Sequence, residues 1–176
     1  MPHRRNIATA GTALPGFARV IAFAGFALAS AVCVAAVDDR SVCGSVPPKS
    51  ATVSACSRLI ASPATSPHDR ALAYSFRANA ARANGDTASA VADYSQALTL
   101  LPDLLPALIG RGIAYRDSND PAHATADFDR ALALHPKDAT ALYQRGLAKR
   151  KSGDTSGGDA DIAAAKAINP GIGDQP

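Results

Sequence analysis

The chain repeats itself every 34 residues, and this period constrains its fold more than any other feature. Each period carries two small residues, a bulky apolar residue, an alanine and a proline at fixed spacings. Chance agreement at this many positions is improbable, so the period indicates stacked copies of one supersecondary unit. The recurring positions are Ala78, Gly112 and Gly146; Ala90, Ala124 and Gly158; Tyr94, Phe128 and Ile162; Ala97, Ala131 and Ala165; and Pro102, Pro136 and Pro170.

The central copy, residues 111–136, indicates two short helices around a polar turn. Leu108, Gly112 and Tyr115 follow an i, i+4, i+7 spacing, which places them on one helical face. Asp120 is positioned to cap a second helix that begins at Pro121 and carries its own apolar stripe. Neither helix could bury its stripe alone, so each needs the other and a neighbour.

Composition favours helices and argues against nucleic-acid binding. Hydrophobic residues make up 47% of the chain and aromatic residues only 5%, and much of the apolar content is alanine, which favours closely packed helices. The net charge of +3 comes from Arg4, Arg5 and Arg19, because the remainder carries 15 basic and 15 acidic residues. We therefore expect an all-α protein with no general affinity for nucleic acid.

Residues 1–36 are typical of an export signal. An uncharged apolar run, Val20 to Ala36, follows the basic residues, and small residues before Val37 suit a signal peptidase. The run is also at the short edge of what spans a bilayer, so an uncleaved anchor remains an alternative. We expect an exported protein, in the bacterial periplasm or secreted. It would be held at the inner membrane through residues 20–36 if the signal is retained.

Residues 37–69 contain two cysteines, Cys43 and Cys56, thirteen positions apart. In an exported chain their simplest interpretation is a disulfide. Two free thiols and a redox-active pair are the alternatives, although the CxxC spacing typical of the latter is absent. The helix expected over 50–62 is similar to the second helix of a repeat, and it would cover the apolar edge of the array.

The 34-residue pattern resembles the tetratricopeptide repeat. The resemblance covers residues 71–172 in three units, 71–104, 105–138 and 139–172, followed by a tail, 173–176. More narrowly, the chain is similar to small exported bacterial proteins that have a Cys-containing leader and an Arg-Gly variant of the repeat. It implies a right-handed α-solenoid of three helical hairpins with an N-terminal capping helix. Gly157 and Gly158 depart from the motif and would weaken the last helix, and no capping helix follows it.

A charged pair recurs inside each unit. An arginine precedes the small residue of every first helix, and an aspartate holds an equivalent position in every second helix. An antiparallel hairpin brings these positions together, so we expect three structural ion pairs with bidentate geometry. The pairs are Arg77 with Asp93, Arg111 with Asp127, and Arg145 with Asp161.

The opposite face of the first helices would bind a partner. In tetratricopeptide proteins this face lines a groove that holds extended peptides, so the resemblance implies a groove here. Its arginines and apolar residues would suit a peptide with acidic groups and an apolar anchor. Alternatively, the arginines are only solvated, with Asp117 neutralising Arg116. The expected partner-binding residues are Asn79, Arg82, Ile109, Ile113, Arg116, Tyr143, Leu147 and Arg150.

The family's carboxylate clamp, which grips a peptide C-terminus, is only partly matched. Asn79 occupies one clamp position, but Ile113 and Leu147 stand where an asparagine and a basic residue would be. We therefore do not expect recognition of a terminal carboxylate.

Catalytic signatures are absent from the sequence. No histidine has a partner at metal-ligand spacing, and no phosphate loop or nucleophile elbow appears. We therefore expect a non-enzymatic scaffold without metal or cofactor, which binds another protein or an extended peptide. The alternatives are a structural element that self-associates through its C-terminal helix, and a membrane-tethered scaffold.

Overall fold

The structure is a computed structural model that describes residues 39–44 and 49–174. The expected signal or anchor, residues 1–36, lies outside the described residues. The described part contains helices and no strand, beginning with a short helical segment over residues 39–44. The longer helices are α2 (Lys49–Ala61), α3 (Pro67–Ala83), α4 (Thr87–Leu100), α5 (Leu105–Asp117), α6 (Pro121–Leu134), α7 (Ala139–Lys151) and α8 (Thr155–Ile168).

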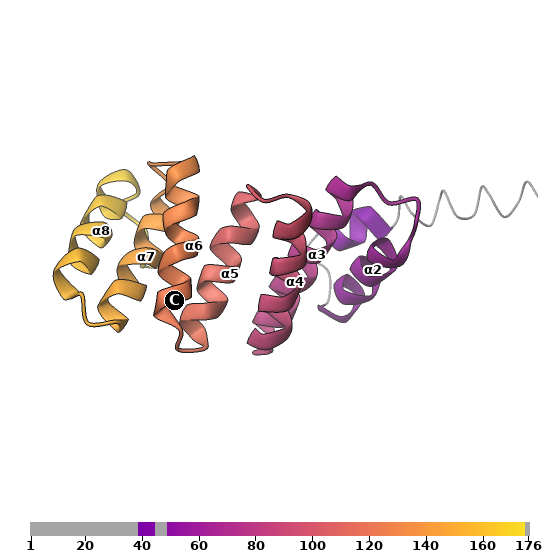
Figure 1. Cartoon of the computed structure of the whole chain (residues 1–176), viewed down its shortest axis with the longest axis horizontal. Helices are drawn as coiled ribbons and strands as arrows, with labels where there is room; N and C mark the ends of the chain where they lie inside the picture. The colour runs from indigo at the N-terminus through magenta and orange to yellow at the C-terminus, as the bar shows by residue number, and fades with distance from the viewer. Residues whose placement is uncertain (1–38, 45–48, 175–176) are drawn as a thin grey trace, which may run out of the picture.

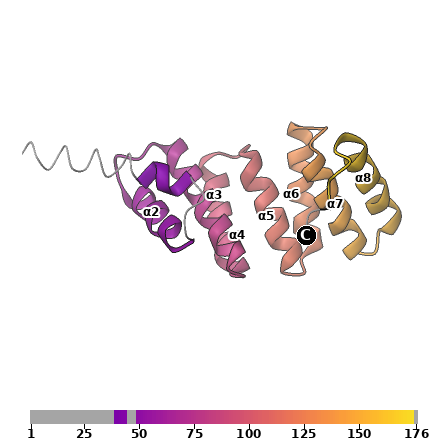
Figure 2. The same ribbon diagram turned by 180° about the vertical axis from the view of Figure 1, so that it is seen from behind.

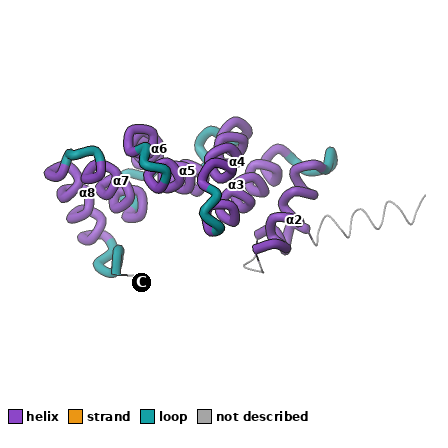
Figure 3. The backbone as a smooth tube through the Cα atoms, turned by 90° about the horizontal axis from the view of Figure 1, so that it is seen from below, coloured by secondary structure: helices purple, strands orange, loops and turns teal. Residues whose placement is uncertain are grey.

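Helices α3 to α8 form three successive hairpins, which follow one another along the long axis (Figures 1 and 2). Each first helix packs against the second helix of its own hairpin, giving the pairs α3 with α4, α5 with α6, and α7 with α8. Each second helix also contacts the next first helix, and α2 meets α3 in the same way (Figure 3). The predicted all-α solenoid of three hairpins with an additional N-terminal helix is confirmed.

The three hairpin turns share one conformation, which explains their repeated sequence. Gly85, Asn119 and Gly153 have φ angles of 83°, 66° and 95°, in the left-handed region that glycine and asparagine tolerate best. The aspartate that follows each of them accepts a hydrogen bond from a backbone N–H three residues later and so caps the second helix. Its own N–H donates to a carbonyl of the last turn of the first helix, which closes the helix end.

The core depends on close approach between helices. Tyr94 and Phe128, at the same position of successive units, are fully buried. A Cβ added to Gly112 of α5 would lie 2.7 Å from the Phe128 ring, so only glycine leaves room for that ring. In the second unit the small residue is therefore fixed by the ring that packs on it.

The last helix is regular although we expected Gly157 and Gly158 to weaken it. α8 runs unbroken from Thr155 to Ile168. A Cβ on Gly158 would lie 2.7 Å from the carbonyl oxygen of Gly146, which shows how closely the backbones of α7 and α8 approach. The contact with α7 offsets the low helix propensity of glycine, which costs about 1 kcal/mol relative to alanine.

We expected no capping helix after the last helix, and the C-terminal tail covers part of the array. Ile172 packs against the main hydrophobic core. Gly173 has φ 88°, and a Cβ there would lie 2.5 Å from the hydroxyl oxygen of Tyr143. The tail therefore folds back onto α7.

The N-terminal leader is attached to α2 and α3. The sulfur atoms of Cys43 and Cys56 lie 2.15 Å apart, at disulfide distance, and both residues are buried beside Leu59. Ion pairs join Asp39 to Arg58 of α2 and Arg40 to Asp69 of α3. No helix within residues 39–44 and 49–174 is both long and apolar enough to cross a membrane.

Replacement of Gly112 by alanine tests the close packing. Because the added methyl would overlap the buried Phe128 ring, Gly112→Ala should lower the free energy of unfolding by about 2 kcal/mol, measured by urea denaturation. Gly171→Ala is the matched control, since the nearest atom to its added Cβ is 3.8 Å away. Equal stability of the two variants would contradict the account of the core.

Candidate functional site

A bidentate ion pair joins the two helices of every hairpin. In the first unit, Nε and Nη2 of Arg77 donate to the two carboxylate oxygens of Asp93, each at 2.7 Å. The equivalent distances are 2.8 and 2.7 Å for Arg111 with Asp127, and 2.7 and 2.7 Å for Arg145 with Asp161. The structure thus brings together the partners of all three expected pairs.

Each arginine also reaches the preceding second helix, a contact that sequence reasoning missed. Nη1 donates to Ser57 of α2 from Arg77, to Ser95 of α4 from Arg111, and to Asp129 of α6 from Arg145. One guanidinium therefore links its own hairpin to the unit before it. The hydrogen bonds to the aspartates raise the pKa of all three arginines above its usual value.

The eight expected partner-binding residues all lie on first helices, as the repeat requires. α3 contacts α5, and α5 contacts α7, so these helices form one continuous face, called here the first-helix face. Asn79 and Arg82 lie on α3, Ile109, Ile113 and Arg116 on α5, and Tyr143, Leu147 and Arg150 on α7.

Asn79 is exposed, and a buried tyrosine forms a hydrogen bond with its side chain. The hydroxyl of Tyr94, from α4, donates to Oδ1 of Asn79 at 2.5 Å. The tyrosine reaches α3 because its ring packs on Gly110 of α5, where any side chain would collide with it. Because Oδ1 accepts this bond, the amide N–H groups of Asn79 remain as donors for a ligand. Gly110 is the residue in the sequence that could have indicated this arrangement.

Arg82 lies beside the same hydroxyl. Burial raises the pKa of Tyr94, and the charge of Arg82 partly opposes this effect. Within the described residues, the buried Nε of Arg82 has no hydrogen-bond partner. The first-unit end of the face therefore combines amide and guanidinium donors around one phenol.

Ile109 and Ile113 pack against the hydrophobic core and are also partly exposed. Both are half-buried, and Ile113 packs against the cluster of Ala124, Phe128 and Ala148. Only part of each side chain is therefore available to a partner.

Arg116 is already engaged within the protein. Its Nη2 lies 2.7 Å from Asp117, Nη1 donates to Gln144 of α7, and the side chain is only 20% exposed. The neutralisation by Asp117 that we considered as an alternative is what the structure contains. Arg116 therefore joins α5 to α7 more than it offers a free charge.

The α7 end of the face is partly covered. Tyr143 contacts the folded-back tail at Gly173, and Leu147 is half-buried. Arg150 is 53% exposed, with its Nε 3.6 Å from Asp159. Arg82, Arg116 and Arg150, the three arginines expected on this face, thus have different environments: Arg82 lies near Tyr94, Arg116 is engaged by Asp117 and Gln144, and Arg150 is exposed.

The histidines of the described part of the chain do not belong to a cluster of metal-ligating residues. No group of three potential metal ligands occurs there. His123 stacks on Tyr115 with ring centroids 5.1 Å apart, and its Nδ1 lies 2.6 Å from Asp120. The hydrogen bond from the backbone N–H of His123, and to a smaller extent the one with its ring, lower the pKa of Asp120.

Repeated hairpins with this packing and these turns define the tetratricopeptide-repeat fold. Among solved structures, the chain is similar to the crystal structure of MamA, with a TM-score of 0.67 and 15% identity over 82% of this chain and 76% of that one. It is also similar to the second tetratricopeptide domain of human RPAP3 in complex with the HSP70 peptide SGPTIEEVD (TM-score 0.58, 21% identity, 61% and 90% covered).

A tetratricopeptide repeat protein from Parabacteroides merdae is similar too, with a TM-score of 0.61 and 20% identity over 69% of this chain and 47% of that one. These structural similarities show that the chain has the tetratricopeptide-repeat fold. No protein-family model matches the sequence, and no curated protein matches it.

Removal of one ion-pair carboxylate tests the structural role of the pairs. Asp127→Ala should lower the free energy of unfolding by about 2–3 kcal/mol, because it leaves the half-buried Arg111 uncompensated. Asp103→Ala, which breaks an exposed pair with Arg130, should cost less than about 0.5 kcal/mol. Thermal unfolding of both variants measures the difference. Unchanged stability of the Asp127 variant would contradict the structural role.

Acid should weaken the third unit through Asp161. Burial alone would raise the pKa of Asp161, but hydrogen bonds from Arg145 and Lys149 hold it below its usual value. A depressed folded pKa stabilises the protein fully above the unfolded pKa, about 3.9, and this contribution is lost as pH falls through the folded pKa. Asp161→Asn should therefore flatten the plot of unfolding free energy against pH below about pH 4. Parallel plots for the two proteins would contradict this assignment.

Proposed function

We propose that this chain is a non-enzymatic interaction module that binds an extended peptide segment with acidic groups on its first-helix face. The observation that carries the proposal is the amide of Asn79, which the hydroxyl of the buried Tyr94 holds in place, with the charge of Arg82 acting on the same hydroxyl. Preorganised donors lose little conformational entropy on binding, so they favour an acceptor-rich ligand. The partly exposed Ile109 and Ile113 beside them supply apolar contact.

Solved structures with the same fold support a peptide as the ligand class. The second domain of human RPAP3 is in complex with an HSP70 peptide, and the second TPR of Spaghetti is bound to the HSP90 peptide SRMEEVD. The Spaghetti domain has a TM-score of 0.55 and 19% identity, over 56% of this chain and 92% of that one. The partial match to a carboxylate clamp favours recognition of internal acidic side chains here.

The tail determines which part of the face a peptide would use. Because Gly173 lies on Tyr143, the peptide would mainly contact α3 and α5. Arg150 would contribute long-range attraction, which affects the association rate more than the affinity.

The proposed location is outside the cytoplasm, in the bacterial periplasm or medium. The apolar run from Val20 to Ala36 and the disulfide distance between Cys43 and Cys56 support it. If the run is retained, the module would be tethered to the inner membrane. The mass of the mature N-terminus distinguishes these two forms.

Self-association through α8 is the second candidate function. Ile168 is 47% exposed, and Ala160, Ala164 and Ala167 of the same helix are exposed as well. Such a face could pair with its copy in a second chain. Sedimentation at rising concentration tests this candidate, and a strict monomer at every concentration would exclude it.

Peptide binding can be tested with a displayed library of extended peptides. Selected peptides should be rich in Asp and Glu and should bind in the micromolar range. Asn79→Ala and Arg82→Ala should each weaken binding about tenfold, through loss of a charge-assisted or preorganised hydrogen bond. The triple variant Arg82→Ala, Arg116→Ala, Arg150→Ala should weaken it further, as measured by fluorescence anisotropy.

The matched control is Arg130→Ala, which removes an exposed arginine from α6, outside the first-helix face. It should change the affinity less than twofold. If the triple variant binds the selected peptides unchanged, the proposed site is wrong.

A further inference from the structure

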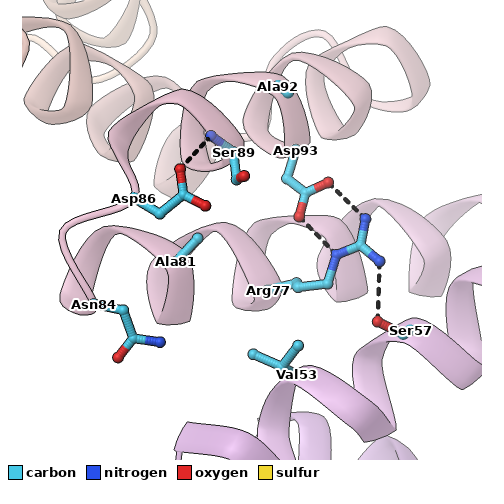
Figure 4. Close-up of a pocket in the computed structure, with 9 residues that line it drawn as sticks. All are labelled: Val53, Ser57, Arg77, Ala81, Asn84, Asp86, Ser89, Ala92 and Asp93. Atoms are coloured by element: carbon cyan, nitrogen blue, oxygen red, sulfur yellow. Dashed lines mark hydrogen bonds and ion pairs between the residues drawn. The ribbon is translucent and has the colours of Figure 1, made fainter.

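A pocket of about 500 Å³ lies between α2, α3 and α4, away from the first-helix face. Figure 4 shows Val53 of α2 and Ala81 of α3 on opposite sides of the opening, with the Arg77–Asp93 pair at one end and Asp86 near the other. None of the eight residues of the first-helix face lines this pocket. It therefore constitutes a separate surface.

The pocket reaches the ion pair because two side chains that are large in the second unit are small here. A shift of 34 residues carries Ala81 onto Tyr115 and Ser89 onto His123. In the second unit these two rings stack, and the guanidinium carbon of Arg111 lies 5.9 Å from the Tyr115 ring centre. The depression there is lined by Tyr115 but not by Arg111 or Asp127. In the first unit the ion pair itself faces the pocket, and the Arg77 side chain is 27% exposed against 21% for Arg111.

The third unit shows which group fits beside the ion pair. The residue equivalent to Ala81 is Lys149, and its Nζ lies 2.9 Å from Oδ2 of Asp161. That carboxylate thus accepts from the lysine ammonium and from its arginine at once. Asp93 of the first unit makes the same bidentate contact with Arg77, but its own chain supplies alanine where the lysine would be.

The side chains that line the pocket carry more negative than positive charge. Arg77, Asp86 and Asp93 together carry one net negative charge. Their third-unit equivalents, Arg145, Asp154 and Asp161, carry the same net charge, and there Lys149 adds a positive charge while Asp129, which also pairs with Arg145, adds a negative one. Asp86 is exposed, and hydrogen bonds from the side chain and backbone of Ser89 lower its pKa, so it is ionised at neutral pH.

We propose that this pocket binds the side chain of a lysine from a partner protein, which supplies the ammonium that Lys149 supplies within the third unit. The ammonium would lie against Asp93 with Asp86 nearby. The methylenes of the lysine would contact Val53, Ala81 and Ala92. Because α2 forms one wall, and Cys56 precedes Ser57 on that helix, the pocket is built jointly by the leader and the first unit.

The direct test is an NMR titration of the full mature chain with Nα-acetyl-lysine amide. Backbone amide signals of Arg77, Ser89 and Asp93 should shift and saturate with a dissociation constant on the order of 1–10 mM, as expected for a fragment of this size. Nα-acetyl-norleucine amide has the same carbon chain without the ammonium. It should bind at least tenfold more weakly.

Three variants test whether binding depends on the pocket. Ala81→Lys reproduces the third unit, so it should raise the melting temperature and abolish the shifts. Asp86→Asn keeps the helix cap, since asparagine caps as well as aspartate, but removes one negative charge. It should weaken binding about threefold. Lys149→Ala should open an equivalent site, seen as new shifts at Arg145 and Asp161.

Three outcomes would overturn the proposal. Equal binding of the norleucine compound would mean that the pocket does not recognise charge. Tighter binding of Nα-acetyl-tyrosine amide would assign the pocket to an aromatic group, as in the second unit. Binding of free cadaverine tenfold tighter than the lysine compound would assign it to small diamines.

Discussion

The bidentate ion pair between the two helices of each hairpin is the interaction on which the rest of the structure depends. Arg111 is held by Asp127 and also bonds Ser95 of the preceding second helix. A guanidinium has five donors in a fixed plane, so it can fix both a helix-to-helix distance and a unit-to-unit contact. A lysine could satisfy one partner but would not set both orientations. The same geometry recurs every 34 residues.

Most of the fold could be predicted because the sequence repeats. Three copies of the same turn, such as Asn119-Asp120, fix the helix ends, and three copies of the small residue fix which faces meet. The regular α8 was harder to anticipate, because the helix propensity of Gly158 is unfavourable while its effect on packing against α7 is favourable. Local propensity and tertiary contact give opposite signals there, and the contact prevails.

The functional surfaces were less predictable, because they depend on where the repeats differ. The period places the eight expected residues on the first helices, while their role in binding follows from the resemblance to tetratricopeptide proteins and stays a prediction. The environments of these residues could not be predicted, because the Tyr94–Asn79 bond requires a ring to pass over Gly110, and Tyr143 contacts the tail, which lies outside the repeat pattern. The position occupied by Ala81, Tyr115 and Lys149 shows the same principle. One place in the fold is open, aromatic or cationic, according to the side chain it carries.

The fold itself does not determine a ligand, since similar solenoids serve many partners. The central claim is that the first-helix face at α3 and α5 contacts the partner. Site-specific photocrosslinking in intact native cells tests it most directly, with the reactive side chain placed at position 79, at position 113, or at the exposed position 126 on α6. The account predicts a shared crosslinked partner from positions 79 and 113 and none from position 126. Crosslinks from position 126 alone would contradict it.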